Sequence, residues 1–259
     1  MAFIDIAGAP FHYRIDGKTG APALLLSNSL GTDLSMWEPQ MPELMRSFRV
    51  IRYDARGHGR SAVTPGPYTI EQLSRDVLGL LDCIGIERAH FCGLSMGGMT
   101  GMWLATHAGY RIDRLVLANT AARIPPAELW NARIEKVNRG GMGVIAQAIL
   151  ERWFTPAFLE SRPPEVATTR AMLEHIPAAG YVAACAAVRD MDQRNAIASI
   201  ACPTLVITGT LDAATPPADG RFIADRIAGA RYVELPAGHL SNLEAAPQFS
   251  AAVLDFLQP

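Results

Sequence analysis

Features typical of exported, redox or membrane proteins are scarce in this sequence. It has four cysteines, Cys83, Cys92, Cys185 and Cys202, and none belongs to a C-x-x-C pair, which argues against a metal site or a redox motif. No basic stretch followed by a long apolar run stands near the amino end, so we expect no signal peptide. No apolar run reaches the length of a transmembrane helix. We therefore expect a cytoplasmic protein with four buried thiols rather than a disulfide framework.

Charge of one sign is lacking as well. The formal net charge is −2 at pH 7, and Lys and Arg form no run. Neither nucleic acid nor an anionic membrane surface is therefore an expected partner. Apolar material is abundant, because hydrophobic residues make up 49% of the 259 residues and charged residues only 19%. This composition is typical of a globular chain, and the length fits one domain or one domain with a sizeable insertion.

Strand-like and helix-like patterns alternate through the first half of the chain. The expected strands are Phe3–Ile6, Phe11–Ile15, Ala23–Ser27, Phe48–Tyr53, Ala89–Cys92 and Ile112–Ala118, and the expected helices are Trp37–Met45, Ile70–Ile84 and Met96–His107. Ala23–Ser27 is a continuous apolar run, which is typical of a strand covered on both faces. The alternation predicts an α/β fold class, with a mostly parallel central sheet and helices on both faces.

The alternation stops near Asn119. Residues 120–189 contain no convincing strand, and their repeated prolines indicate short helices. The later expected elements are the strands Pro203–Thr208 and Arg231–Leu235 and a final helix over Ala251–Leu257. The pattern predicts an α/β core made of residues 1–119 and 190–259, interrupted by a helical insertion over residues 120–189.

The strongest local motif is G-L-S-M-G, at Gly93–Gly97. It follows an expected strand and precedes an expected helix, which is the context of a nucleophile elbow. Small residues two before and two after the serine let neighbouring backbone approach a tight, strained turn. The turn also places Ser95 at a helix amino end, where amide hydrogens stabilise negative charge. Ser95 is therefore the predicted nucleophile.

A serine nucleophile needs a general base, and His239 is the best placed histidine. It follows the expected strand Arg231–Leu235 in P-A-G-H-L, just before the final helix. A loop at that point lies at the carboxyl edge of the sheet, on the side of Ser95. The other histidines fit structural or surface positions better: His12, His58, His90, His107 and His175.

The base needs an orienting carboxylate, and Asp212 follows the expected strand Pro203–Thr208 in G-T-L-D. The chain order serine, aspartate, histidine is the order expected for this type of fold. Asp190 and Asp192 come before that strand and lie on the wrong side of it. Asp219 falls in the helix that follows, so Asp212 is the predicted orienting residue.

An oxyanion hole is expected from two backbone N–H groups. One belongs to Met96, the residue after the nucleophile. The other comes from the loop S-N-S-L-G over Ser27–Gly31, where Leu30 is the first choice. Ser29 is the next best donor and an expected substrate contact. A plain turn is the structural alternative for this loop.

Several stretches spread over the whole chain carry a family resemblance. They are N-S-L-G-T-D-L-S-M-W (Asn28–Trp37), Y-D-A-R-G-H-G-R-S (Tyr53–Ser61), G-L-S-M-G-G-M (Gly93–Met99), W-N-A-R-I (Trp130–Ile134), A-V-R-D-M-D (Ala187–Asp192), G-T-L-D-A-A-T-P (Gly209–Pro216) and G-H-L-S-N-L-E (Gly238–Glu244). On these residues the chain resembles the 3-oxoadipate enol-lactonases, a branch of the α/β-hydrolases. The resemblance implies hydrolysis of an anionic lactone to 3-oxoadipate, with no cofactor or metal, under a helical cap.

A substrate of that kind carries a carboxylate away from the lactone, and burying this charge unpaired would be costly. Arg133 in the insertion is the expected partner. Trp130 lies three residues earlier, so the two share a helix face and Trp130 supplies an apolar wall. A core tryptophan and a solvated arginine are the structural alternatives, and Arg56, Arg189 and Arg194 are the other candidate partners of the carboxylate.

Other functions stay open at this level. A carboxylesterase or a carbon–carbon hydrolase would use the same serine, aspartate and histidine. A ligand-binding protein without catalysis is a further alternative, against which the intact order of Ser95, Asp212 and His239 argues. The sequence does not indicate an oligomeric state.

Overall fold

A sheet of eight strands forms the centre of the computed structural model, which describes residues 2–161 and 163–258. The strands are β1 (Ala2–Ile6), β2 (Ala9–Gly17), β3 (Ala23–Ser27), β4 (Arg49–Tyr53), β5 (Ala89–Leu94), β6 (Ile112–Ala118), β7 (Thr204–Gly209) and β8 (Arg231–Leu235). Their spatial order is β1-β2-β4-β3-β5-β6-β7-β8. The β1–β2 and β2–β4 pairs are antiparallel, and every neighbouring pair from β4 to β8 is parallel. The predicted α/β fold class is confirmed.

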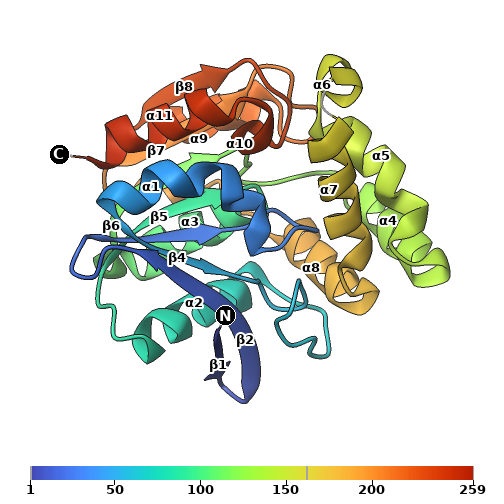
Figure 1. Cartoon of the computed structure of the whole chain (residues 1–259). Coiled ribbons are helices and arrows are strands. Elements are labelled where there is room, and N and C mark those ends of the chain that lie inside the picture. The colour runs from blue at the N-terminus through green and yellow to red at the C-terminus, as the bar shows by residue number, and fades with distance from the viewer. Residues whose placement is uncertain (1, 162, 259) are drawn as a thin grey trace.

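Helices cover both faces of this sheet (Figure 1). Around the sheet lie α1 (Met41–Ser47), α2 (Ile70–Cys83), α3 (Met96–His107), α9 (Pro217–Arg226), α10 (Ser241–Glu244) and α11 (Ala246–Leu257), with short 3-10 helices η1 (Leu34–Gln40), η2 (Gly109–Arg111) and η3 (Ile197–Ser199). α1 and α11 pack together on one face, and α2 and α3 pack together on the other. Every residue of β5 and β7 is consequently buried, as expected for parallel strands that are covered on both faces.

The segment between β6 and β7 contains only helical elements in the part that the structure describes. They are α4 (Ala127–Gly140), α5 (Gly143–Trp153), α6 (Pro156–Ser161), α7 (Pro163–His175) and α8 (Ala178–Asp190), followed by η3. The five helices gather at one end of the sheet (Figure 1). No single described helix is long and apolar enough to span a membrane, and α7 and α8 pass that test only as a pair bent by 95°.

The predicted boundaries of two helices differ from the structure more than the predicted boundaries of the strands do. The helix expected over Trp37–Met45 is two elements, η1 and α1. Pro39 lies inside η1 and Pro42 in the first turn of α1, and a proline without an N–H interrupts a continuous helical ladder. The final helix begins at Ala246 rather than Ala251, since Pro247 occupies a first-turn position where no N–H is needed.

The four cysteines are all free thiols. Cys92 and Cys185 are buried as expected, but Cys83 is exposed and Cys202 is half-buried. The expectation of four buried thiols is therefore wrong for two of them. Cys83 is the last residue of α2, and Cys202 lies in the loop before β7. Both positions therefore lie at the margin of the hydrophobic core.

Candidate active site

Ser95 stands on a sharp turn between β5 and α3, with φ 57° and ψ −114°. A Cβ atom on Gly93 would collide with the carbonyl oxygen of Gly97, and one on Gly97 would collide with that of Ser27. Both glycines are therefore needed for strand, turn and helix to approach this closely. The Ser95 N–H donates to the Ala118 carbonyl at 2.9 Å, which fixes the turn to the neighbouring strand β6.

This turn holds Ser95 in a backbone region that non-glycine residues rarely adopt, at a cost of about 1–3 kcal/mol. The Ser95 carbonyl accepts a hydrogen bond from the Thr120 hydroxyl at 2.8 Å. The strain is thus balanced by bonds on both sides of the residue. The turn directs the hydroxyl away from the sheet, at the amino end of α3.

His239 and Asp212 form a buried pair. The His239 Nδ1 and the Asp212 Oδ2 are 2.8 Å apart, and the two side chains are 3% and 0% exposed. His239 follows β8 and Asp212 follows β7, so neighbouring parallel strands present them at one edge of the sheet. Since Nδ1 faces the carboxylate, the pair fixes the ring orientation and leaves Nε2 for another partner.

The Asp212 carboxylate accepts hydrogen bonds from four further donors. They are the Ala214 N–H at 2.7 Å, the Thr215 N–H at 2.9 Å, the Thr215 hydroxyl at 2.8 Å and the Asn119 amide at 2.9 Å. Burial raises the pKa of Asp212, but the charge of His239 and the bonds from His239, Asn119 and Thr215 outweigh it and lower the pKa to about 2. Asp212 is therefore an anion throughout the neutral pH range.

Asn119 supports this pair and was not identified from the sequence. It follows β6 with a positive φ of 45°. Its amide nitrogen donates to Asp212 and, at 3.2 Å, to the Gly238 carbonyl, while its oxygen accepts from the Ser241 hydroxyl at 2.5 Å. Its position directly after a buried strand, at the same edge as Ser95, is the sequence signal that could have revealed it.

The His239 loop is also tied to the helical segment. The His239 N–H donates to the Trp153 carbonyl at 2.8 Å. The Glu244 carboxylate accepts from the Gly238 N–H at 2.9 Å and from the Thr155 N–H at 3.2 Å. The corner between α5 and α6 is therefore joined by hydrogen bonds to the loop that carries the histidine.

The loop after β3 offers a free N–H group at Leu30. The neighbouring N–H groups are occupied, because that of Ser29 faces the Met36 sulfur at 3.4 Å and that of Gly31 donates to the His58 Nε2 at 3.0 Å. Within the described residues the Leu30 N–H has no acceptor. Met96 begins α3, where first-turn N–H groups have no intrahelical partner. These two groups are the predicted oxyanion donors, and the free state of Leu30 favours it over Ser29.

His58 fixes the loop after β3 through a hydrogen bond. Its Nε2 accepts from Gly31, and its Nδ1 lies 3.2 Å from the Arg56 carbonyl, to which it donates. Complete burial lowers the pKa of His58 to about 4, although the bond to Arg56 acts in the opposite direction. The ring is therefore neutral at pH 7, as its role as an acceptor requires.

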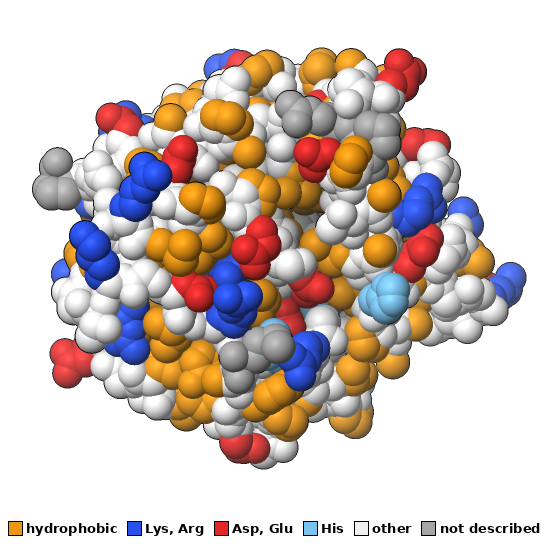
Figure 2. Space-filling model, viewed as in Figure 1, with side chains coloured by type: hydrophobic (Ala, Val, Ile, Leu, Met, Phe, Trp, Pro, Cys, Tyr) orange, Lys and Arg blue, Asp and Glu red, His pale blue; other side chains and the backbone are white. Residues whose placement is uncertain are grey.

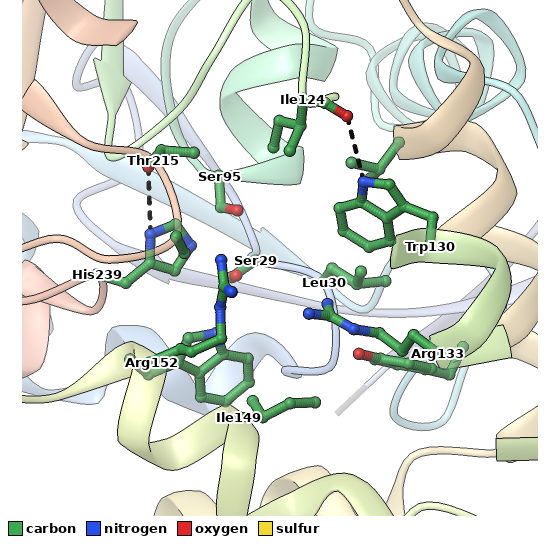
Figure 3. Close-up of a pocket in the computed structure, with 14 residues that line it drawn as sticks. Ser29, Leu30, Ser95, Ile124, Trp130, Arg133, Ile149, Arg152, Thr215 and His239 are labelled. Atoms are coloured by element: carbon green, nitrogen blue, oxygen red, sulfur yellow. Dashed lines mark hydrogen bonds between the residues drawn. The ribbon is translucent and has the colours of Figure 1, made fainter. Parts of the chain in front are cut away.

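Ser95 and His239 face a common pocket (Figure 3). Its walls come from the loop after β3, from α4, α5 and α8, and from the Asp212 loop. The pocket is lined by Ser29, Leu30, Ser95, Ile124, Trp130, Arg133, Ile149, Arg152, Trp153, Tyr181, Val188, Ala214, Thr215 and His239. The Ser29 hydroxyl is buried without a hydrogen-bond partner, so a polar atom inside the pocket is left for a ligand.

Trp130 and Arg133 both line the pocket, as their spacing predicts. The Arg133 guanidinium lies over the Trp130 ring, with its carbon 4.7 Å from the ring centre, which fits a cation–π contact. The Trp130 indole N–H donates to the Ile124 carbonyl at 3.3 Å. The tryptophan thus forms a wall, and the arginine extends along it towards the centre (Figure 3).

Arg152 is a second pocket cation that sequence reasoning missed. It reaches the pocket from α5 and donates to the Ala213 carbonyl at 3.1 Å. Burial and the charge of Arg133 lower its pKa, while the charge of Asp212 raises it. Ile149, Arg152 and Trp153 are spaced three and four residues apart on one helix face, and this spacing was the available signal.

The alternative arginines lie outside the pocket and have carboxylate partners. Arg56 pairs with Asp76, Arg189 with Asp190 and Arg194 with Asp192. The same pairs occupy two of the competing aspartates, Asp190 and Asp192. Asp219 lies in α9, as expected.

The fold and the arrangement of the pocket indicate the class of protein to which this chain belongs. A family model described as alpha/beta hydrolase fold matches residues 22–246, and the chain belongs to this family. Within it, the resemblance to enol-lactonases is confirmed. The chain is 44% identical to 3-oxoadipate enol-lactonase 2 of Acinetobacter baylyi, over 93% of this chain and 91% of the relative.

Solved structures agree with this assignment. The enol-lactonase from Burkholderia xenovorans LB400 superposes with a TM-score of 0.98 at 51% identity, with both chains fully covered. A hydrolase from Pseudomonas aeruginosa PA01 superposes with a TM-score of 0.97 at 52% identity, over 100% of this chain and 98% of that one. The likeness extends through the helical segment as well as the sheet.

Proposed function

We propose that this protein hydrolyses 3-oxoadipate enol-lactone to 3-oxoadipate. The observation that carries the proposal is the pocket itself: Ser95 and His239 face a largely apolar hollow that also contains the guanidinium groups of Arg133 and Arg152. No Asp or Glu lines this pocket among the described residues. A small anionic ester fits such a surface, and the Acinetobacter relative is named for an anionic lactone.

The chemistry follows from the proposed roles. Ser95 Oγ bonds to the lactone carbonyl carbon as its proton passes to His239, which Asp212 orients. The N–H groups of Leu30 and Met96 donate to the oxyanion that develops on the carbonyl oxygen. The ring carbon–oxygen bond then breaks, His239 gives its proton to the leaving enolate oxygen, and the resulting enol becomes a ketone. Water, activated by His239, cleaves the acyl-enzyme and frees Ser95.

Substrate binding uses the helical wall. Arg133 pairs with the carboxylate that lies away from the lactone, and Trp130 contacts the apolar part of the molecule. The buried hydroxyl of Ser29, which has no partner in the protein, donates to a substrate oxygen. This arrangement compensates the charge of the substrate while its apolar surface leaves water.

The helical segment serves as a cap. Residues 120–189 cover the nucleophile, and residues 1–119 and 190–259 form the hydrolase core. The cap supplies both arginines and Trp130, whereas the core supplies the reacting groups. The cytoplasmic location expected from the sequence is part of this proposal.

The decisive test is turnover of freshly generated 3-oxoadipate enol-lactone by the purified chain, with Ser95→Ala as the blank. Loss of the enol-lactone absorbance together with formation of 3-oxoadipate supports the proposal. A panel of neutral esters and dienone acids separates it from a carboxylesterase or a carbon–carbon hydrolase. If the neutral esters were turned over far faster than the lactone, the proposed substrate would be wrong.

A further inference from the structure

A second hollow lies outside the pocket, between α4 and α5. It has a volume of about 300 Å³, against about 50 Å³ for the pocket. The two share Ile124, Trp130, Arg133, Ile149, Arg152 and Ala214 as lining residues. One narrow space and one wider space thus meet at the same side chains. We call the outer one the α4–α5 groove.

The α4–α5 groove is lined by three positively charged side chains. Lys136 lines it together with Arg133 and Arg152, and no Asp or Glu does so among the described residues. Lys136 and Arg133 are three residues apart, on one face of α4. Two acids of α4 and α5 have partners of their own: Glu135 pairs with Arg139, and Glu151 accepts from Gln147 at 2.6 Å.

The gathering of basic side chains without acidic ones is a feature of this groove. Figure 2 shows one face of the molecule, where acidic and basic side chains are interspersed, and the whole chain has a formal net charge of −2. A mixed surface of this kind attracts no anion over a distance. Three cations that line one groove, with no acid among the described lining residues, create a local positive potential.

We propose that the α4–α5 groove is the entrance to the pocket and concentrates small organic anions ahead of the reaction. An organic carboxylate is attracted by Lys136 at the outer end and passes to Arg133 and Arg152 where the two hollows meet. The inference rests on the proposed function only for the negative charge of the substrate. It adds an access route and a role for a lysine that takes no part in the chemistry.

The charge of the entrance is tested with Lys136→Glu. The chain has one other lysine, Lys18, which is exposed in the turn after β2, so Lys18→Glu makes the same change in total charge far from the groove. We expect Lys136→Glu to lower kcat/KM for the enol-lactone about threefold at low ionic strength, with kcat unchanged. High salt should remove the difference, because it screens exposed charges.

A neutral ester completes this experiment. Its kcat/KM should be the same for the native protein, Lys136→Glu and Lys18→Glu, since no charge is attracted. Equal losses in the two lysine variants would assign the effect to total charge, and a loss that persists in high salt would assign it to altered structure. Either result overturns the proposed role of Lys136.

The route itself is tested by filling the groove. Ala132 on α4 and Ala148 on α5 are exposed residues that line it. Ala132→Trp and Ala148→Trp should lower kcat/KM at least about fivefold for the neutral ester and the enol-lactone alike. Ala251→Trp, at an exposed position of α11, is the control. Unchanged rates in both groove variants, with the folded state verified, would place the entrance elsewhere.

Binding of adipate separates a failure of this inference from a failure of the proposed function. Adipate is an anion that is not hydrolysed, and Trp130 and Trp153 line the pocket, so their fluorescence reports its arrival. Lys136→Glu should slow adipate association about threefold at low salt even if the enol-lactone is no substrate. Association at the native rate would refute the entrance in either case.

Discussion

The sheet edge and the helical segment build one pocket in two different ways. At the sheet edge each polar group is fixed by several partners, as Asp212 shows with its bonds from His239, Asn119, Thr215 and Ala214. In the helical segment Arg133 contacts the Trp130 ring and the Tyr181 hydroxyl, and Arg152 donates to one carbonyl group. Bond breaking requires fixed geometry, whereas charge recognition tolerates side chains that adjust.

This contrast divides the consequences of mutation. Changes at the sheet edge should reduce the turnover of every substrate, because all of them would use the proposed nucleophile and base. Changes on α4 and α5 should affect substrates according to their charge. The following substitutions test that division.

Replacement of the nucleophile should have the largest effect. Ser95→Ala retains the backbone strain and the surrounding hydrogen bonds, so the protein should fold, but turnover should fall at least about a thousandfold. The loss should be equal for the enol-lactone and for a neutral ester. Steady-state assays of both substrates give the result, and more than a tenth of native activity would remove Ser95 from its proposed role.

Asp212→Asn should reduce kcat by about a hundred- to a thousandfold and change KM little, because it disturbs the orientation of His239 rather than substrate binding. Asp219→Asn is a matched control, since Asp219 follows the same strand but lies in α9. The control should retain nearly native kcat. A native kcat in Asp212→Asn would transfer the orienting role to another group.

Arg133→Met keeps an unbranched apolar stem over Trp130 and removes the charge. Truncation of one partner of a desolvated charge pair costs about 2–5 kcal/mol, so kcat/KM for the enol-lactone should fall at least about tenfold. The methyl ester of the substrate carboxylate should be much less affected. Arg189→Met, outside the pocket, is the control.

Two other outcomes of that experiment are informative. Equal losses for the charged and the neutral substrate would mean that Arg133 maintains the shape of the helical segment. No loss for either would assign the carboxylate to Arg152, and Arg152→Met would then be the next variant to measure.

We expect the smallest effect on activity at His58, where the change should appear in the stability of the protein. In the folded protein this ring stays neutral until the pH falls to about 4, whereas in the unfolded chain it takes up a proton near its ordinary value of 6.5. The unfolded state binds more protons in this window, so the free energy of unfolding should fall by about 3 kcal/mol from pH 6.5 to 4. Above pH 6.5 the contribution is complete.

Urea unfolding at several pH values measures this slope. His58→Gln is the comparison, because an amide oxygen can accept the Gly31 N–H and does not titrate. The variant should show a flatter pH dependence over this window. Parallel curves for the two proteins would mean that His58 does not govern the acid stability of the loop.

The sequence predicted the two regions unequally. Gly93 and Gly97 belong to a motif whose spacing has a steric reason. Asp212 and His239 each follow a recognisable strand, so the sequence pattern predicts that they lie at one edge of the sheet. Asn119 and Arg152 have no motif. Asn119 depends on a positive φ and on three partners from distant loops, and Arg152 depends on how α5 is oriented above the sheet. Tertiary packing decides such positions, and local sequence does not record it.

The bond from the His239 N–H to the Trp153 carbonyl sets a limit on how this molecule can open. If α5 and α6 swung away as a rigid lid, they would withdraw this acceptor and break the bond from the Thr155 N–H to the Glu244 carboxylate. In an opened molecule the His239 loop would lose its bonds to the helical segment, whereas the bond from His239 to Asp212 lies within the core and would remain. The α5–α6 corner would thus couple any opening of the helical segment to the mobility of the loop that carries the histidine.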